Sequence, residues 1–259
     1  MTAPAAGPSP GRLYLVPNTL DLGTEIEPDL REVLPQAVIS RAASLGHWVA
    51  ENAKTTRAFL KRVDRLVPLA QPLQAINIQE LPRPRKGAAP GADTQDLRHL
   101  LAPIVSGHDI GLLSEAGLPA VADPGALLVH AAHALGVVVE PMSGPSSLLL
   151  ALAASGLNGQ SFAFVGYLPV EAAARATRIR ELDALSRRLG QTQIAIETPY
   201  RNAALLAALA EHLQPGTRLS VACGLTLPGG WCRTQAAKAW RDAPPVLADR
   251  LPAVFSWLA

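Results

Sequence analysis

The stretch Ser114-Glu115-Ala116-Gly117-Leu118-Pro119, continued by Ala122-Asp123-Pro124-Gly125, decides how this chain is interpreted. It follows an apolar run that ends at Leu113 and precedes a helical pattern. Its small residues let a ligand approach the backbone closely, and Glu115 and Asp123 could bind hydroxyl or amino groups. The residues alone leave a second interpretation open, an ordinary strand-to-helix turn in which Asp123 caps a helix that begins at Pro124.

Around this stretch, short apolar runs alternate with longer helical patterns. The alternation predicts an α/β fold with largely parallel sheets. The expected strands are 13–16, 48–51, 109–113, 137–140, 162–165, 193–197, 218–222 and 253–257. The expected helices are 29–43, 54–63, 94–105, 125–135, 146–154, 171–189 and 202–213.

The same stretch also sets the expected domain boundary, because residues 117–125 are rich in glycine and proline. We expect a disordered, proline-rich tail over residues 1–11, an N-terminal α/β domain over 12–120 and a C-terminal α/β domain over 121–259. Ligands of open parallel sheets bind beyond the carboxyl ends of the strands, so the residues after each expected strand are the candidates for chemistry.

Three more polar segments follow expected strands. Residues 143–147 place Pro145 at the first position of a helix, which leaves backbone N–H groups free for a nucleotide or carboxylate, although a plain capped helix has the same sequence. Residues 197–202 carry more polar groups than a turn requires. Glu51 and Arg57 could reach one cleft or form a local ion pair.

Composition narrows the class of protein. The 259 residues are 49% apolar and 17% charged, and no apolar run approaches a membrane span. Neither a secretory leader nor a zinc-site spacing is present, and Cys223 and Cys232 are too few for a disulfide framework. We therefore expect a cytoplasmic protein that neither spans a membrane nor binds a metal ion.

The formal net charge of +2 requires any nucleic-acid surface to be a local patch. Arg83, Arg85 and Lys86 form the candidate patch, or a solvated loop. The sequence lacks the motifs of dinucleotide-binding proteins, P-loop proteins, serine hydrolases and zinc proteases. Membership of these classes is therefore disfavoured.

Taken in order, four segments resemble the tetrapyrrole methylase family, and within it the branch that methylates ribosomal RNA. Residues 114–125 correspond to S-D-A-G-T-P-x-x-x-D-P-G, and residues 143–146 to P-G-P-S. Residues 166–169 correspond to G-F-L-P, and residues 197–201 to E-S-P-H-R. The resemblance runs from about Leu13 to the end of the chain.

This resemblance implies two α/β domains of the tetrapyrrole methylase fold, a cleft between them that binds S-adenosyl-L-methionine, and a homodimer. Together with the segments above, it gives these candidate cofactor-binding residues: Pro17, Ser114, Glu115, Ala116, Gly117, Leu118, Asp123, Gly144, Ser146, Ser147, Thr198, Cys223, Gly224, Thr226, Pro252 and Ala253.

The chain departs from the RNA-methylating pattern in three places. Residues 17–21 stand where the pattern has T-P-I-G-N, and residues 50–54 stand where it has A-E-D-T-R. Residues 223–227 stand where it has R-E-L-T-K, so the Arg, the Glu and the Lys of that segment are absent. These changes indicate a divergent sister group whose target can differ. A small heterocycle or tetrapyrrole is therefore an alternative acceptor, and a cofactor-binding module without catalysis is a third interpretation.

Methyl transfer needs an acceptor aligned with the sulfur–methyl bond. If the acceptor is a ribose hydroxyl of ribosomal RNA, a base must also remove its proton. The candidates are Glu51, Glu115, Asp123 and Glu197, of which we favour Glu51 or Glu197. Arg57 and Arg201 are the candidates for holding phosphates.

Overall fold

The computed structural model describes residues 10–21, 24, 26–82, 96–248 and 250–259. The described chain forms two compact units. The first contains residues 10–21 and Pro28–Pro145, and the second contains Ser146–Ala259 with Thr24 and residues 26–27. The candidate basic patch at Arg83, Arg85 and Lys86 lies outside the described residues.

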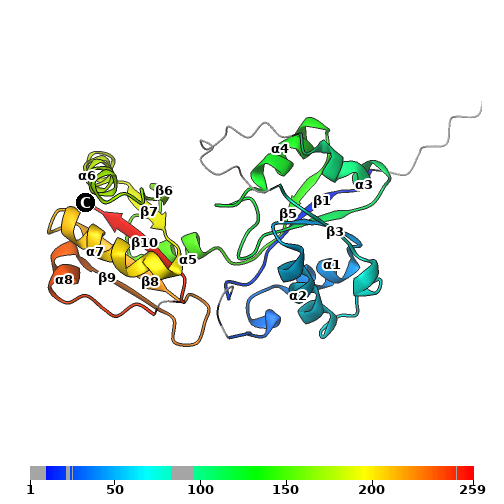
Figure 1. The fold of residues 1–259 in the computed structure, drawn as a ribbon, viewed down its shortest axis with the longest axis horizontal. Helices are drawn as coiled ribbons and strands as arrows, with labels where there is room; N and C mark the ends of the chain where they lie inside the picture. Colours follow the sequence, from blue (N-terminus) through cyan, green and yellow to red (C-terminus); the bar gives the residue numbers. More distant parts are fainter. Residues whose placement is uncertain (1–9, 22–23, 25, 83–95, 249) are drawn as a thin grey trace, which may run out of the picture. The chain divides into compact units, whose positions relative to one another are not determined.

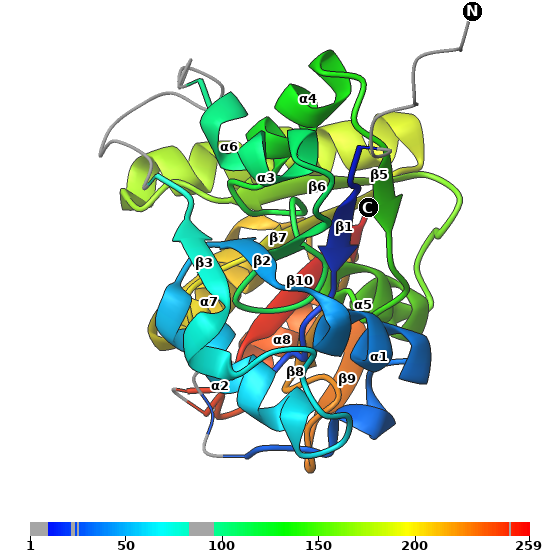
Figure 2. The ribbon, with the colours of Figure 1, turned by 90° about the vertical axis from the view of Figure 1, so that its right-hand side faces the viewer.

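The first unit is built on a parallel sheet of five strands in the order β3-β2-β4-β1-β5. These strands are β1 (Leu13–Val16), β2 (His47–Ala50), β3 (Asn77–Glu80), β4 (Ile110–Leu113) and β5 (Val139–Pro141). Figure 2 shows β1 beside β5. Because every strand runs the same way, all five carboxyl ends lie at one edge of the sheet.

Helices cover both faces of this sheet (Figure 1). One face carries α1 (Gln36–Ser44) and α2 (Ala53–Asp64), and the other carries α3 (Ala102–Val105) and α4 (Ala126–Ala134). Single turns form η1 (Leu30–Glu32), η2 (Leu73–Ala75) and η3 (Arg98–Leu101). The Trp48 ring packs directly on Gly111, where an added Cβ would lie 2.7 Å from the ring. A larger residue at position 111 would therefore displace the indole from the core.

The second unit is built on a mixed sheet in the order β6-β7-β10-β8-β9. Its strands are β6 (Phe162–Tyr167), β7 (Thr192–Ile196), β8 (Arg218–Cys223), β9 (Trp231–Ala236) and β10 (Ala253–Leu258). Only β6 and β7 pair in parallel among the described strands of this sheet, so the expectation of largely parallel sheets is wrong for this unit. The short link from β8 to β9 allows an antiparallel hairpin and leaves no room for a crossover helix.

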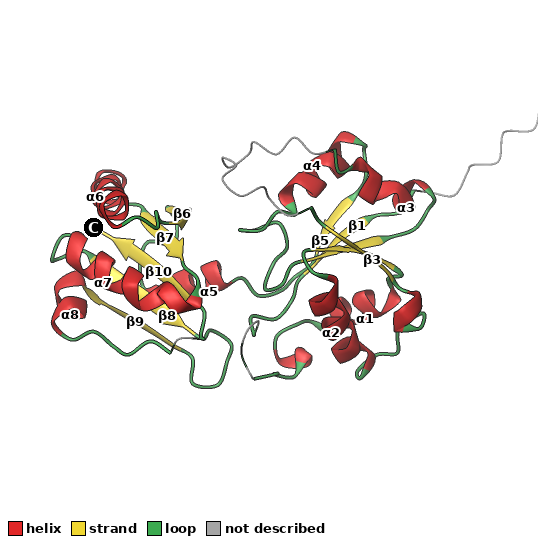
Figure 3. Ribbon diagram, in the orientation of Figure 1, coloured by secondary structure: helices red, strands yellow, loops and turns green. Residues whose placement is uncertain are grey.

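This sheet also lies between helices (Figure 3). Helix α5 (Ser147–Ser155) covers one face. The other face carries α6 (Ala172–Leu189), η4 (Pro199–Arg201), α7 (Asn202–His212) and α8 (Ala237–Asp242). Three tryptophans belong to this face: Trp240 and Trp257 are fully buried, and Trp231 packs at the margin.

The expected elements agree with the structure in most places. All eight expected strands overlap observed ones, whereas β3, β9 and α8 were not predicted. The expected helix over residues 29–43 is wrong in its first half, because Pro35 lies at the N-cap of α1 and separates it from η1.

The division of the chain also differs from expectation. The two units divide between Pro145 and Ser146, later than residues 120 and 121, because β5 still pairs with β1 in the first sheet. Of the expected tail, residues 1–9 lie outside the described residues, and Gly11 is buried and donates its N–H to the Ile104 carbonyl at 3.0 Å.

Candidate active site

The carboxyl edge of the first sheet brings together three candidate residues from distant parts of the sequence. Val16 pairs with Leu113, and Leu113 pairs with Ala50 on the other side. The next residue of each strand is Pro17, Ser114 or Glu51. These three candidates therefore follow neighbouring parallel strands at one edge of the sheet.

Asn18 joins the loop after β1 to the loop after β4. Its side-chain amide donates to the carbonyls of Ser114 and Glu115, both at 3.1 Å, and its backbone N–H donates to Gly117 at 2.9 Å. Gly117 returns a bond from its N–H to the Thr19 carbonyl at 3.3 Å. This role of Asn18 was not predicted, although an amide residue just after a strand end is a usable signal in the sequence.

A second contact that was not predicted from the sequence holds the loop after β1 against helix α2. Arg62 of α2 donates to Asp21 at 2.9 Å and to the Pro28 carbonyl at 2.8 Å. Both side chains of the ion pair are largely buried, at 14% and 11% exposure. Thr19 also donates its hydroxyl to Asp21. Residues 17–21, which depart from the family pattern, are therefore held by contacts of their own.

Glu51 and Asp123 form a carboxylate pair beside Ser114. Burial, followed by the nearby Asp123 carboxylate, raises the pKa of Glu51 to about 7. Burial also raises the pKa of Asp123. Glu51 Oε1 is buried and accepts no hydrogen bond from any described residue. Two neighbouring carboxyl groups whose pKa values are both raised are typical of catalytic acid–base pairs.

This position of Asp123 decides between the two interpretations of the 114–125 segment. Helix α4 begins at Ala126, and its N-cap Gly125 supplies no side-chain hydrogen bond. The interpretation in which Asp123 caps a helix starting at Pro124 is therefore wrong. Asp123 instead belongs to the carboxylate pair.

Three non-glycine residues in the candidate loops of the two units have a left-handed backbone. Ala120 and Ala122 have φ values of 65° and 67° in the loop after β4, and Thr226 has a φ of 66° in the loop after β8. Such conformations cost about 1–2 kcal/mol each for residues with a Cβ, and they concentrate at functional sites. Their position in two loops that were singled out from the sequence supports a functional role for both.

Gly144 lies against Pro17. An added Cβ at Gly144 would approach the Pro17 ring to 2.2 Å, closer than any real contact. Glycine is therefore required here because the loop after β5 lies directly against the Pro17 ring of the loop after β1.

The second unit gathers the other candidates at one edge of its own sheet. Val254 pairs with Ile196, and Ala253 pairs with Cys223. Since β10 runs antiparallel to both neighbours, its start lies beside their ends, and the N–H of Gly224 donates to the Pro252 carbonyl at 3.0 Å. This edge collects Thr198, Cys223, Gly224, Pro252 and Ala253.

Glu197 is fully engaged within this edge. Its carboxylate accepts from Arg201 at 2.6 Å and from the N–H of Thr198 at 2.8 Å. The Glu197 side chain is only 3% exposed, and that of Arg201 is 25% exposed. This pair stabilises the turn between β7 and α7, and both oxygens of the Glu197 carboxylate are occupied by hydrogen bonds within it.

Ser146 and Ser147 begin α5. Ser146 is the N-cap with extended backbone, it is 9% exposed, and its side chain makes no capping bond. The helix expected over 146–154 is observed over Ser147–Ser155, so Pro145 precedes the N-cap and does not occupy the first helical position. First-turn N–H groups without a side-chain cap are suited to an anionic ligand.

Arg57 lies on the exposed side of α2 and donates to the carbonyl of Ala53 at 3.4 Å. No ion pair joins it to Glu51 in the described part of the chain. Asn52 caps the same helix by accepting from the N–H of Lys54 at 2.9 Å. Position 52, where the family pattern has Asp, thus serves helix α2.

Within the described residues, no cluster of three or more His, Cys, Asp and Glu side chains is arranged to hold a metal ion. Nor is any helix in that part of the chain long and apolar enough to span a membrane.

Solved structures share this fold. Uroporphyrin-III-C-methyltransferase from Thermus thermophilus aligns over 96% of this chain and 92% of its own, with a TM-score of 0.50 and 17% identity. The methyltransferase CobJ aligns over 95% and 93%, with a TM-score of 0.53 and 17% identity. At this identity the likeness establishes the fold alone.

Sequence relatives are closer. "Ribosomal RNA small subunit methyltransferase I" of Xylella fastidiosa is 32% identical over 202 residues, which cover 78% of this chain and 64% of the relative. The protein of that name from Mesorhizobium japonicum is 38% identical over 143 residues, covering 55% and 47%. The chain thus matches about half to two thirds of the length of these relatives. The sequence model of the family "Tetrapyrrole (Corrin/Porphyrin) Methylases" matches residues 38–230, and the chain therefore belongs to that family.

Proposed function

We propose that this chain is an S-adenosyl-L-methionine-dependent methyltransferase that methylates a ribose hydroxyl of small-subunit ribosomal RNA. Membership of a methylase family supports the reaction, and the shared name of the relatives supports the acceptor. The structural observation that carries the proposal is the Glu51 and Asp123 carboxylate pair at the carboxyl edge of the first sheet. We further propose that the protein acts as a homodimer in the cytoplasm.

The residues at the two sheet edges fit the proposed cofactor. When bound, S-adenosyl-L-methionine supplies a methyl group activated by a positively charged sulfur. In the first unit, Pro17 and the turn of Ala116, Gly117 and Leu118 would line it with uncharged residues. In the second unit, the first turn of α5, which has no side-chain cap, suits its carboxylate.

Within this proposal Glu51 is the general base. A base with a pKa near the working pH removes a proton most effectively, and burial beside Asp123 brings the pKa of Glu51 to about 7. In this role the Glu51 carboxylate would accept the hydroxyl proton of the acceptor, while S-adenosyl-L-methionine, when bound, would supply the methyl group. We assign this role to Glu51 in preference to Glu197, because Arg201 and the Thr198 N–H occupy the Glu197 carboxylate.

Methyl transfer from labelled cofactor tests the function directly. The purified chain is incubated with naked small-subunit ribosomal RNA, with assembled bacterial small subunits and with a small-molecule extract. We expect label in the RNA, at a ribose 2′ oxygen. Label only in a heterocycle or tetrapyrrole would replace the RNA acceptor, and cofactor binding with no transfer to any acceptor would indicate a silent module.

Cofactor binding is tested separately by calorimetry of the Ser146→Asp variant. Aspartate at this N-cap keeps a good helix cap but places negative charge at the first turn of α5. We expect binding of S-adenosyl-L-methionine to weaken by about tenfold or more, because its carboxylate is repelled. The Ser146→Asn variant, a neutral cap of the same shape, is the matched control and keeps the wild-type affinity. Equal affinities of the two variants would remove α5 from the cofactor site.

A further inference from the structure

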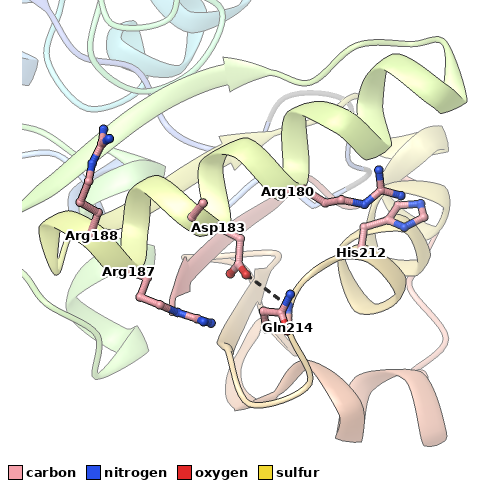
Figure 4. A pocket seen from close by; sticks show the side chains of 7 residues that line it. Arg180, Asp183, Arg187, Arg188, His212 and Gln214 are labelled. Carbon is pink, nitrogen blue, oxygen red and sulfur yellow. Dashed lines mark hydrogen bonds between the residues drawn. The ribbon is translucent and has the colours of Figure 1, made fainter.

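An open pocket lies between α6 and α7, on the face of the second sheet that α6, α7 and α8 cover. It lies away from the candidate cofactor-binding and catalytic residues. Its volume is about 370 Å³. Figure 4 shows the side chains that line it. The lining residues are Arg180, Asp183, Ala184, Arg187, Arg188, His212 and Gln214.

Helical spacing places the charged residues of α6 around this pocket. Arg180, Asp183 and Arg187 are three and seven residues apart and therefore share one face of the helix. In Figure 4, Arg180 extends toward His212 of α7, whereas Arg187 lies beside Asp183 and Gln214. Arg188 points away from the others. Two separate basic positions, one at Arg180 and one at Arg187, thus flank the pocket.

The only carboxylate that lines the pocket is already used inside the protein. Asp183 is 4% exposed and accepts from the Thr217 hydroxyl at 2.8 Å and from the Gln214 N–H at 3.3 Å. Asp183 therefore stabilises the turn after α7. The nearby Glu211 carboxylate lies 4.0 Å from His212 Nε2, and the Glu211 side chain is 70% exposed.

The arginines of α6 fall into two groups. Arg175 donates to the Val170 carbonyl at 2.9 Å, and Arg178 donates to Glu181 at 3.2 Å. Arg180, Arg187 and Arg188 are exposed and form no ion pair or hydrogen bond with any residue of the described chain, and Arg188 points away from the other two. Their positive charge is directed to solvent and is available to an anion.

We propose that this pocket binds the phosphate backbone of the RNA acceptor. Arg180 and Arg187 lie roughly 10 Å apart along the helix axis. When their side chains extend apart, one small anion cannot contact both guanidinium groups. A nucleic acid offers a series of phosphates at such spacings, and guanidinium groups bind phosphate oxygens in pairs. The inference rests on the proposed function, because it assumes that the acceptor is RNA.

The test compares two variants of the full chain. Arg180→Gln/Arg187→Gln removes both charges from the pocket, and Arg178→Gln removes one exposed arginine from another part of the same helix. All three side chains are exposed, so neither variant disturbs the core. Binding of naked small-subunit ribosomal RNA is measured by fluorescence anisotropy over a range of salt concentrations, together with kcat and KM for methyl transfer.

We expect the pocket variant to bind RNA about tenfold more weakly at low salt and to lose roughly 1.4 from the slope of log K against log salt, about 0.7 for each lost phosphate contact with a single strand. KM for RNA rises while kcat and cofactor affinity stay unchanged. The Arg178→Gln variant behaves like wild type.

Two results would overturn the inference while leaving the proposed function intact. The first is RNA methylation by wild type with the same RNA affinity and salt slope in both variants. The second is unchanged RNA binding with loss of self-association in the pocket variant, which would make the pocket a contact between copies. If wild type methylates only a heterocycle, the proposed function fails first, and the inference fails with it.

Discussion

Replacing Glu51 by glutamine changes one half-buried carboxylate to a neutral amide of the same shape. In the wild type, burial and Asp123 raise the pKa of Glu51 to about 7, against an ordinary value of 4.5. The folded protein therefore holds the proton more tightly than the unfolded chain does. The stability linked to this proton is fully present below pH 4.5 and is lost as the pH rises through 7.

The size of this effect follows from the difference in pKa. A difference of about 2.5 units corresponds to roughly 3.4 kcal/mol, and partial exposure of the site reduces this to about 1–2 kcal/mol. Between pH 4.5 and pH 8, the free energy of unfolding of Glu51→Gln should therefore rise by about 1–2 kcal/mol relative to wild type. The same change removes the proposed base, so kcat should fall by about 10²- to 10⁴-fold.

Urea unfolding followed by hydrogen exchange in β2 and β4 measures the stability of the first unit by itself. Glu32→Gln makes the same chemical change at an exposed position and is the control. The pH dependence of kcat is measured in parallel. If Glu51→Gln and wild type show parallel stability profiles from pH 4.5 to 8, and kcat is unchanged, both the raised pKa and the role as base are wrong.

Three further substitutions test particular contacts. Gly144→Ala places a Cβ 2.2 Å from Pro17, and we expect a loss of about 1–3 kcal/mol in thermal unfolding together with weaker cofactor binding; normal stability would show that the two loops can separate. Asp183→Ala removes the acceptor of the Thr217 and Gln214 bonds, which should cost about 2–3 kcal/mol in urea unfolding, whereas Asp183→Asn should restore part of the loss. Arg201→Met leaves the buried Glu197 carboxylate without its cation, so the variant should lose about 1–3 kcal/mol at pH 8; a double variant with Glu197→Gln should recover most of it, and absence of recovery would contradict the ion-pair explanation.

The sequence predicted all the central strands of both sheets, and the edge strands β5 and β6 as well. Strands such as β4, with four buried residues, have continuous apolar sequences that are readily recognised. Strands β3 and β9 lie at sheet edges and were missed, because their polar residues give no apolar run. The antiparallel pairing in the second sheet depends on long-range register, which local sequence patterns do not contain.

The sequence predicted which residues belong to the candidate site better than it predicted the contacts that these residues make. Motif order and strand ends were enough to select Glu51, Ser114 and Asp123. Only the structure separates the roles of the two favoured glutamates, because the distance from Glu197 to Arg201 and the partnerless Glu51 Oε1 are properties of packing. The interactions of Asn18 likewise depend on a loop nearly 100 residues away.

Strand β10 comes after the other strands of its sheet in the sequence, yet it pairs with β7 on one side and β8 on the other. During synthesis, which proceeds at roughly 5–20 residues per second, the first unit can complete its sheet while much of the second is still being translated. In the second unit, β6 with β7 and β8 with β9 remain two separate ribbons until residues 253–258 leave the ribosome. Strand β10 then inserts between them, and until it does so both ribbons present unpaired edges to which another chain can bind.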